Sequence, residues 1–519
     1  MTNSTQTSYE ELPYIGQAFA FTHPDHLATV ATFMGLAPPH PDKCRVLEIG
    51  CGDGRNLIPM AESLPDATVV GIDLAKSHTD EANRLAVEVG LSNVRFLQMD
   101  LMDLPQDFGI FDYIICHGVY SWVPPQVQDR ILQLCRDHLS DNGIAFVSFN
   151  TLPGWHTRRV IRDMTRLHAD AVDTPAQKMR VAKEYLEAFS VGISNQSDPY
   201  SELIRREVQK AKNHPDFYFF HEHLEEFNTP CYLHEFAVRA ASHELQYVSD
   251  VEPTLTLPVC GAPPIEQFLE TVATDRVGRD QHLDFLTNRT FRKSLLCRQH
   301  HSVSLNPVAA RVCEFYVSSG GRPESTSYSL SDRSELVFRT FDGFSVMINE
   351  PLIKSAFLRL VEASPAKLSC RQLLTDARAK LGLIPTDETT DAADMEHLTH
   401  WLLRTHRNSP ASMIHISCVP ARHATTVPEF PKVSPAVRKL AAMKESVTNR
   451  RHERLGDDDT YVNILPLLDG THDRPSLISA VERLKEQGFV KPLFPGESGA
   501  QMTHRLLMNF LQFGLYVTD

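Results

Sequence analysis

The chain has 519 residues, and its 51 Lys and Arg against 65 Asp and Glu give a net charge of −14 at pH 7. This length predicts three or four domains, and the negative charge argues against a general nucleic-acid-binding protein, which needs a basic face for phosphates. No apolar run approaches the roughly 20 residues of a membrane helix, and the first eight residues lack the features of a secretory signal. The ten cysteines include no CxxC pair and are typical of buried thiols in a reducing compartment. We therefore expect a soluble, cytoplasmic protein.

Between residues 44 and 150, short apolar runs alternate with amphipathic stretches. The apolar runs predict strands and the amphipathic stretches predict helices. The expected strands are 45–49, 68–73, 94–98, 111–117 and 144–149, and the expected helices are 56–64, 78–89 and 127–139. This alternation is typical of an α/β fold, a Rossmann-like doubly wound parallel sheet with helices on both faces. In such sheets ligands bind at the carboxyl ends of the strands.

The pattern changes after about residue 155 and becomes mainly helical. Apolar spacing predicts a helix over 232–245, and Thr229-Pro230 is a typical signal for its start. Further on, residues 334–348 predict a β-hairpin that turns at Asp342-Gly343, and a helical block follows. From these changes we expect four domains, at residues 1–165, 166–300, 301–427 and 428–519.

The stretch Glu48-Ile-Gly50-Cys51-Gly52-Asp-Gly54 follows the first expected strand directly and opens a helix. Glycines there let the backbone turn tightly and approach a ligand closely. The spacing is G-x-G-x-G, whereas a dinucleotide site would place its third glycine one position later. A carboxylate two residues before the first glycine repels a pyrophosphate and suits a cationic ligand such as S-adenosylmethionine.

Two further carboxylates end the second and third expected strands. Asp73 can accept hydrogen bonds from both hydroxyls of a ribose, and Asp100, before Leu101, can accept one from an adenine amino group. Each feature has a structural alternative, since Gly54 could serve packing alone and Asp100 could cap a helix. The three carboxylates at successive strand ends together favour an S-adenosylmethionine site.

The run from Val46 to Ala61 resembles the first motif of class I S-adenosylmethionine-dependent methyltransferases. The strings FDYIICHGVYSWVP (111–124) and SFNTLPGWH (148–156) resemble the rickettsial-type protein lysine methyltransferases, whose known substrates are bacterial outer membrane proteins. The resemblance extends to about residue 300 and is looser beyond it, where ILPLLDGTH (464–472) is similar to that family's terminal winged helix. It implies a methyltransferase core, a mainly helical regulatory or dimerising middle domain and winged-helix-like α+β C-terminal domains.

The resemblance also implies roles for residues around the cofactor. Glu48, Gly50, Cys51, Gly52 and Asn56 would line its methionine end. Asp73 and Leu74 would hold the ribose, Asp100 and Leu101 the adenine, and His117 would form a wall beside the sulfonium.

Candidates for the transfer step lie where the methyl group should project. Tyr14, Tyr120, Trp122 and Trp155 could form an aromatic channel around an alkyl amine, although the tryptophans could equally be core residues. His117 could take a proton or be a structural histidine. Asn150, at the end of the fifth strand, could hold the incoming amine or cap a turn.

The histidines at 214, 221, 223 and 234 do not form an HExxH pattern, because residues 221 and 223 lie on different helix faces. We therefore predict no metal. The basic run at 438–454 adjoins three aspartates and is typical of a solvated helix face.

The leading hypothesis is methylation of lysine side chains of a protein substrate. The resemblance implies that this substrate is an outer membrane protein before export. It also implies a homodimer formed through the middle domain. The alternatives are a small-molecule methyltransferase, which the large C-terminal region disfavours, and a non-catalytic, cofactor-sensing regulatory or scaffold protein. Nucleic acid is not an expected partner.

Overall fold

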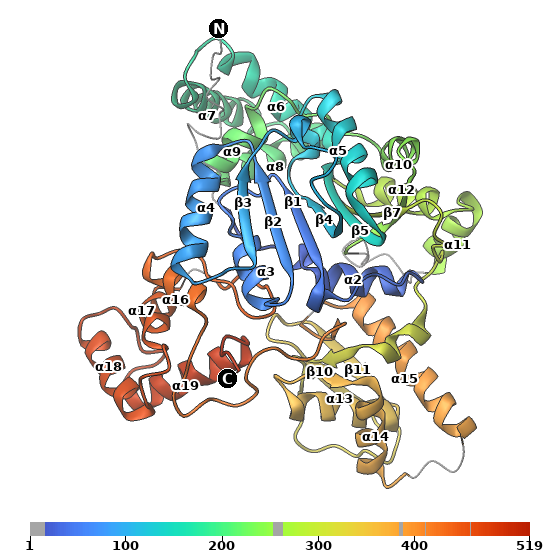
Figure 1. Cartoon of the computed structure of the whole chain (residues 1–519), viewed down its shortest axis with the longest axis vertical. Helices are drawn as coiled ribbons and strands as arrows, with labels where there is room; N and C mark the ends of the chain where they lie inside the picture. The colour runs from blue at the N-terminus through green and yellow to red at the C-terminus, as the bar shows by residue number, and fades with distance from the viewer. Residues whose placement is uncertain (1–15, 253–262, 384–387, 411, 457, 519) are drawn as a thin grey trace.

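The computed structural model describes residues 16–252, 263–383, 388–410, 412–456 and 458–518. Its centre is a seven-stranded sheet with the strand order β3-β2-β1-β4-β5-β7-β6 (Figure 1). The strands are β1 (Arg45–Ile49), β2 (Thr68–Asp73), β3 (Val94–Gln98), β4 (Phe111–Cys116), β5 (Leu139–Asn150), β6 (Leu245–Asp250) and β7 (Phe291–Arg298). The first five strands run parallel, as predicted, and β7 lies antiparallel between β5 and β6.

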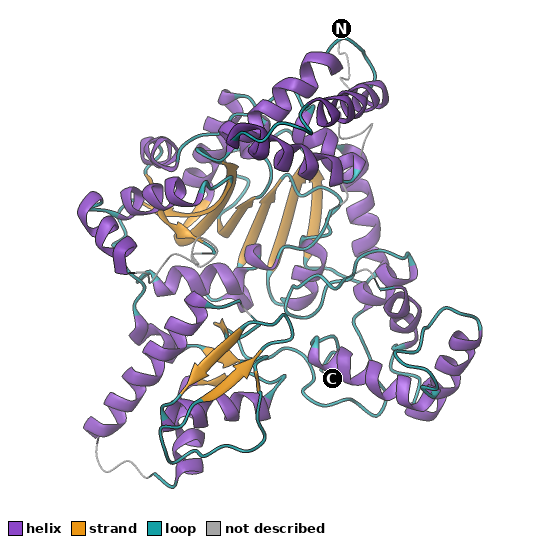
Figure 2. Ribbon diagram, turned by 180° about the vertical axis from the view of Figure 1, so that it is seen from behind, coloured by secondary structure: helices purple, strands orange, loops and turns teal. Residues whose placement is uncertain are grey.

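Helices cover both faces of this sheet, because each strand points alternate apolar side chains to opposite sides. One face packs on α2 (Pro24–Phe33), α3 (Leu57–Ser63) and α4 (Lys76–Glu88). The other packs on α5 (Pro125–His138) and α10 (Leu233–Ser242). The view from behind shows the same layered arrangement (Figure 2). The α/β fold class is therefore confirmed.

Two features differ from the sequence-based expectation. The stretch after residue 165 is mainly helical but also supplies β6 and β7, which join the core sheet. The helix expected at 232–245 is confirmed as α10, but it ends at Ser242, and Leu245 begins β6. Its N-terminal cap is Tyr232, so the start signal at Thr229-Pro230 was wrong. Thr229 instead packs on the core, where its backbone N–H donates to the Ser121 carbonyl at 2.9 Å.

A helical group lies above the sheet in Figure 1 and packs around its own apolar cluster. It consists of α6 (Trp155–Ala169), α7 (Pro175–Gly192), α8 (Pro199–Asn213) and α9 (Asp216–His223). Below the sheet lie two small three-stranded sheets, one of which contains the predicted hairpin as β10 (Leu336–Arg339) and β11 (Ser345–Ile348). Their neighbouring helices are α13 (Pro351–Ala363), α14 (Cys370–Leu381) and α15 (Glu388–Asn408).

The C-terminal helices form a further body beside α3 and α4 (Figure 1). They are α16 (Pro435–Ala442), α17 (Asp459–Ile464), α18 (Arg474–Glu486) and α19 (Gly499–Gln512). The apolar side chains of this body and of the α3 face of the sheet form one continuous cluster. In the part of the chain that the structure describes, no helix has both the length and the apolar character needed to cross a membrane.

Candidate cofactor and substrate site

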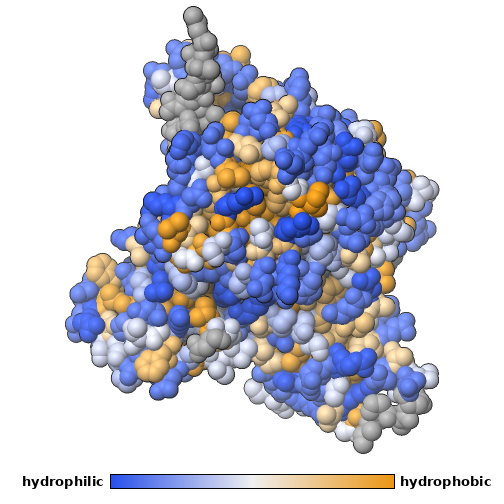
Figure 3. Space-filling model, in the orientation of Figure 1, coloured by the Kyte–Doolittle hydropathy of each residue, from blue (hydrophilic) through white to orange (hydrophobic). Residues whose placement is uncertain are grey.

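A cavity of about 800 Å³ opens at the carboxyl ends of β1, β2 and β4. Its walls come from the loops after these strands, from residues 16–21 and from helices α6 and α9. Figure 3 shows apolar side chains gathered in the middle of this face of the molecule, over the upper part of the sheet. The carboxyl ends of the strands, where the cavity opens, form the edge at which doubly wound sheets bind ligands.

Glu48, the penultimate residue of β1, is 4% exposed and lines the cavity. Its Oε1 accepts a hydrogen bond from Asn56 Nδ2 at 2.7 Å, whereas its buried Oε2 has no protein partner. Burial and the nearby carboxylates of Asp73 and Asp53 raise the pKa of Glu48 to about 8. A buried carboxylate oxygen without a partner at a cavity wall suits a cationic ligand, such as the ammonium group of S-adenosylmethionine.

The glycine loop is shaped by β2, which lies beside it. The backbone N–H groups of Gly50 and Cys51 both donate to the Ile72 carbonyl, at 2.8 and 3.1 Å. Gly50 and Gly52 have φ values of +73° and +53°, which glycine adopts without strain. A Cβ on Gly52 would meet no protein atom within 4 Å, so this position borders open space.

Gly54 has a different role from Gly50 and Gly52. A Cβ on Gly54 would lie 2.8 Å from both Ala82 of α4 and Phe96 of β3, so the lack of a side chain lets the loop pack closely against these two elements. The geometry supports the packing interpretation for Gly54.

Asp73 ends β2 and ties the two loops together. Its carboxylate accepts hydrogen bonds from Gly52 N at 2.8 Å and from Ala75 N at 2.9 Å, and it lines the cavity together with Leu74. Leu74 is 52% exposed, which is an unfavourable state for leucine unless a ligand covers it.

The third strand contributes Asp100 and Leu101 to the same cavity. Asp100 Oδ1 accepts a hydrogen bond from Met102 N at 2.9 Å, so the capping role is present, while the side chain stays exposed. Met102 and Val127 also line this end, and their apolar surfaces suit a flat base.

His117 follows β4 and lies among aromatic rings. The centroids of Phe19 and Phe21 are 4.2 and 5.2 Å from the imidazole centroid, and His117 Nδ1 is 2.9 Å from Ser148 Oγ. Burial, with a smaller effect of Lys293, lowers the pKa of His117 to about 3. Such a ring stays neutral and is a poor proton acceptor. We therefore favour the role of His117 as part of the cavity wall over a role as a general base.

The remaining transfer candidates separate into two groups. Trp122 and Asn150 line the cavity, and Asn150 Nδ2 is 3.4 Å from Asn228 Oδ1. Tyr120 and Trp155 do not line it: Tyr120 is fully buried against Phe149 and Phe236, and Trp155 packs behind Trp122 at a ring distance of 6.1 Å. Neither ring borders the cavity, and the Arg158 guanidinium lies over the Trp155 ring, so the geometry favours a packing role for Tyr120 and Trp155. Tyr14 lies outside the described residues.

Several cavity residues were not expected from the sequence. Gly16, Phe19 and Phe21 come from the segment before α2, and Lys293 from β7. Helices α6 and α9 add four polar or aromatic side chains, namely Arg158, Tyr218, His221 and Glu222. The histidines at 221 and 223, considered above only as metal ligands, lie in α9 and were the sequence signal for this part of the site.

Arg158 and His221 each contact a carboxylate at or beside this wall. Arg158 Nη1 lies 3.3 Å from Glu222 Oε1, and His221 Nδ1 lies 2.6 Å from Glu225 Oε1. Burial raises the pKa of Glu222. The part of the cavity wall that α6 and α9 form is thus polar and charged.

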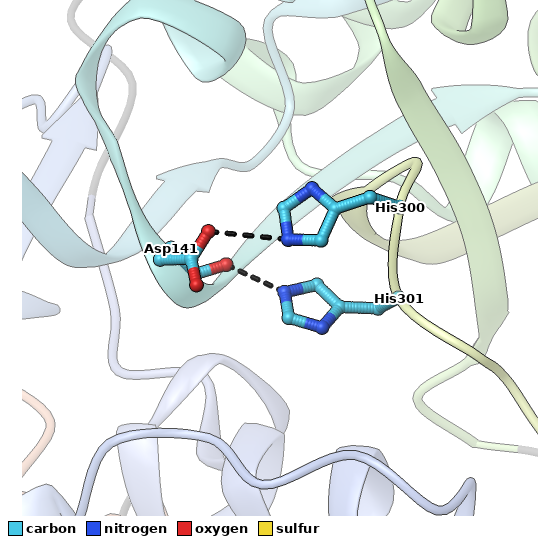
Figure 4. Close-up of side chains that lie close together, drawn as sticks. All are labelled: Asp141, His300 and His301. Atoms are coloured by element: carbon cyan, nitrogen blue, oxygen red, sulfur yellow. Dashed lines mark hydrogen bonds and ion pairs between the residues drawn. The ribbon is translucent and has the colours of Figure 1, made fainter.

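Among the described residues, Asp141, His300 and His301 form a group with metal-ligand spacing. Figure 4 shows both imidazole rings turned toward Asp141. His300 Nε2 lies 3.2 Å from Asp141 Oδ1, and His301 Nε2 lies 2.7 Å from the Asp141 carbonyl oxygen. The group lies near the start of β5, at the end opposite to the cavity, so it takes no part in the site described above.

The sheet, the glycine loop and the orphaned Glu48 carboxylate define a class I S-adenosylmethionine-dependent methyltransferase. Three family models match the chain: "Methyltransferase domain" at residues 46–143, "Predicted methyltransferase regulatory domain" at 215–298 and "PKMT, C-terminal winged helix domain" at 429–506. Protein RP789 of Rickettsia prowazekii is 33% identical, over 92% of this chain and 86% of its own length. The chain belongs to the family of RP789.

A solved structure, PKMT2 from Rickettsia typhi, is 28% identical and covers 97% of this chain and all of its own, with a TM-score of 0.85. The same protein in complex with AdoHcy covers 98% of this chain, with a TM-score of 0.83. The cofactor of this chain is therefore S-adenosylmethionine, and the residues around the cavity fit it. Where each contact falls stays a prediction, with Glu48 at the ammonium, Asp73 at the ribose and Asp100 at the adenine.

Proposed function

We propose that this enzyme methylates lysine side chains of a protein substrate. The observation that carries the proposal is the similarity to PKMT2 over nearly the whole chain, which includes the helices and the C-terminal body and not only the methyltransferase core. A small-molecule methyltransferase needs one pocket and has no use for so much additional structure.

The cavity suits an amine acceptor in two respects. Attack on the methyl group of S-adenosylmethionine requires a neutral amine held in line with the sulfur–methyl bond. The rings of Phe19, Phe21 and Trp122 enclose apolar space, and such an environment favours the neutral form of a lysine amine over the charged form.

Polar groups at the wall can then orient the amine. The Asn150 amide can accept a hydrogen bond from the amine nitrogen, and the edge of His117 fills space that water would otherwise occupy. Because His117 is neutral and weakly basic, it is not the group that takes the proton of the amine. S-adenosylmethionine, when bound, supplies the methyl group.

The proposal extends to the setting of the reaction. We infer that the substrate is an outer membrane protein methylated in the cytoplasm before export, which agrees with the unpaired state of the cysteines among the described residues. We also propose a homodimer formed through the middle part of the chain and a division into parts at 1–165, 166–300, 301–427 and 428–519, the second of which supplies two strands to the core sheet.

The test is methyl transfer from radiolabelled S-adenosylmethionine to proteins of the source cell, followed by mass spectrometry of the labelled bands. We expect a mass gain of one or more methyl groups on lysine, absent when Asp73 is replaced by Ala. Label that enters only small molecules would overturn the protein-substrate proposal while leaving the methyltransferase assignment intact.

A further inference from the structure

Residues 445–454 of the C-terminal body, here named the docking segment, lie against the loop that follows β1. Arg55 Nη2 pairs with Glu445 Oε2 at 2.5 Å, and Arg454 Nη1 donates to Gln17 Oε1 at 2.9 Å. His452 Nε2 lies 2.9 Å from Asn56 Oδ1, across 396 residues of sequence. Arg55, Asn56 and Gln17 all line the cofactor cavity, so the segment supports that cavity from behind.

The docking segment has a fixed shape of its own. Leu455 N donates to the Val447 carbonyl and Asn449 N to the Glu453 carbonyl, both at 2.9 Å, which closes a tight hairpin. Within this hairpin His452 has a φ of +62°, a left-handed conformation that is uncommon for residues other than glycine. Such strain persists where surrounding contacts hold it, and it is found most often at functional sites.

His452 is 1% exposed, and burial lowers its pKa well below the ordinary value, so the ring is neutral. The backbone N–H of Phe19 can only donate, and it lies 3.0 Å from Asn56 Oδ1, so the Asn56 amide turns its NH2 group toward Glu48 Oε1, at 2.7 Å. Asn56 Oδ1 therefore faces His452, and His452 Nε2–H is the donor. This bond and the one from Phe19 N at 3.0 Å fix the orientation of the amide.

We propose that the docking segment completes the cofactor site, with His452 as a positioning residue that acts through Asn56 on Glu48. The hydrogen bond from His452 holds the Asn56 amide, the amide holds Glu48 Oε1, and Glu48 Oε2 is thereby directed at the ammonium group of the cofactor. Cofactor affinity then depends on how the C-terminal body is seated, and by linkage the cofactor stabilises that seating.

The test compares two replacements of His452 that carry the same backbone strain. His452→Gln keeps a donor near the position of Nε2, and His452→Leu removes it. We expect calorimetry with AdoHcy to give a Kd raised about tenfold for H452L and within about threefold of wild type for H452Q. Equal weakening by both variants, or no weakening by H452L, would overturn the proposal.

Two further variants separate a loss of cofactor affinity from a loss of protein stability. His423 is buried in the same part of the chain, and its Nδ1 lies 3.2 Å from the Ala424 carbonyl oxygen; H423L is expected to leave the Kd unchanged even if its melting temperature falls. Should H452L not fold, Glu445→Gln decides instead, since it breaks the partly exposed ion pair with Arg55 alone. We expect it to raise the Kd about threefold at low salt, and an unchanged Kd would contradict the proposal.

Discussion

The carboxyl group of Glu48 is buried at the wall of the cofactor cavity. Its raised pKa means that the cofactor-free protein holds this group partly protonated at neutral pH. The stabilising contribution of the neutral carboxyl is complete below the unfolded pKa near 4.5 and is lost as the pH rises through about 8. A cationic ligand has the opposite preference, because it binds the ionised form.

Cofactor affinity should therefore rise with pH up to about 8. We expect the Kd for AdoHcy to fall by up to about tenfold per unit between pH 6 and 7, with uptake of protons by the buffer on binding. Calorimetry in two buffers of different ionisation enthalpy measures both effects. In Glu48→Gln the Kd should be larger and independent of pH over this range; a wild-type Kd that does not change between pH 6 and 8 would contradict the argument.

Gly52 and Gly54, two residues apart in the loop between β1 and α3, serve different purposes, and matched alanine variants separate them. Gly52→Ala meets no protein atom and costs only about 1 kcal/mol of left-handed strain, but its methyl group enters the cofactor space, so the Kd should rise tenfold or more. Gly54→Ala adds overpacking against Ala82 and Phe96 and should cost about 2–4 kcal/mol of unfolding free energy. Urea denaturation and AdoHcy calorimetry on both variants check this, and the reverse ranking would refute it.

At the scale of elements, β7 is anchored by a buried charge. Arg292 is 1% exposed and forms a two-point bond to Asp284 of α12 (Arg276–Thr287), with Nε to Oδ2 at 2.9 Å and Nη2 to Oδ1 at 2.7 Å. Its Nη1 also donates to the Tyr247 hydroxyl of β6 at 2.9 Å. One side chain thus joins α12 to the two strands that complete the sheet.

Replacing Arg292 with Met should cost about 3–5 kcal/mol of unfolding free energy. The buried Asp284 carboxylate loses both hydrogen bonds from Arg292 and keeps the more distant Arg289, whose Nη1 lies 3.9 Å away. The neighbouring Lys293 pairs with Glu252, and the two side chains are 17% and 24% exposed. Because solvent can still reach Glu252, Lys293→Met should cost less than Arg292→Met. Urea denaturation compares the two, and equal midpoints for R292M and wild type would rule out the anchoring role.

The sequence predicted some of these elements better than others. Strands β1 to β5 stand out because each is an apolar run next to an amphipathic helix. Strand β7 carries Arg292, Lys293 and Ser294 in its first half. Its partner β6 ends at Asp250, far before it in the sequence, so neither the pattern nor the spacing marks the two strands as part of the sheet. Arg292 finds its partners in α12 and β6, which no local pattern contains.

At the scale of the whole molecule, some residues of the site could be predicted from the sequence and others could not. Glu48, Asp73 and Asp100 were predictable as a group because chain order in a parallel sheet places successive strand ends along one edge. Phe19 and Phe21 at the His117 ring, and His452 behind Asn56, depend on how distant parts of the chain meet. The left-handed backbone of His452 has no sequence signature, since it arises from the hairpin around it.

The antiparallel pairing of β5 with β7 also governs how the protein is made. Roughly 150 residues separate the end of β5 from the end of β7, and a ribosome needs about 7–30 s to synthesise them. During that time β5 is an unpaired edge with a largely apolar face, the kind of surface on which nascent chains aggregate. The emerging helices α6 to α9, or a chaperone, must shield that edge until the last strand arrives.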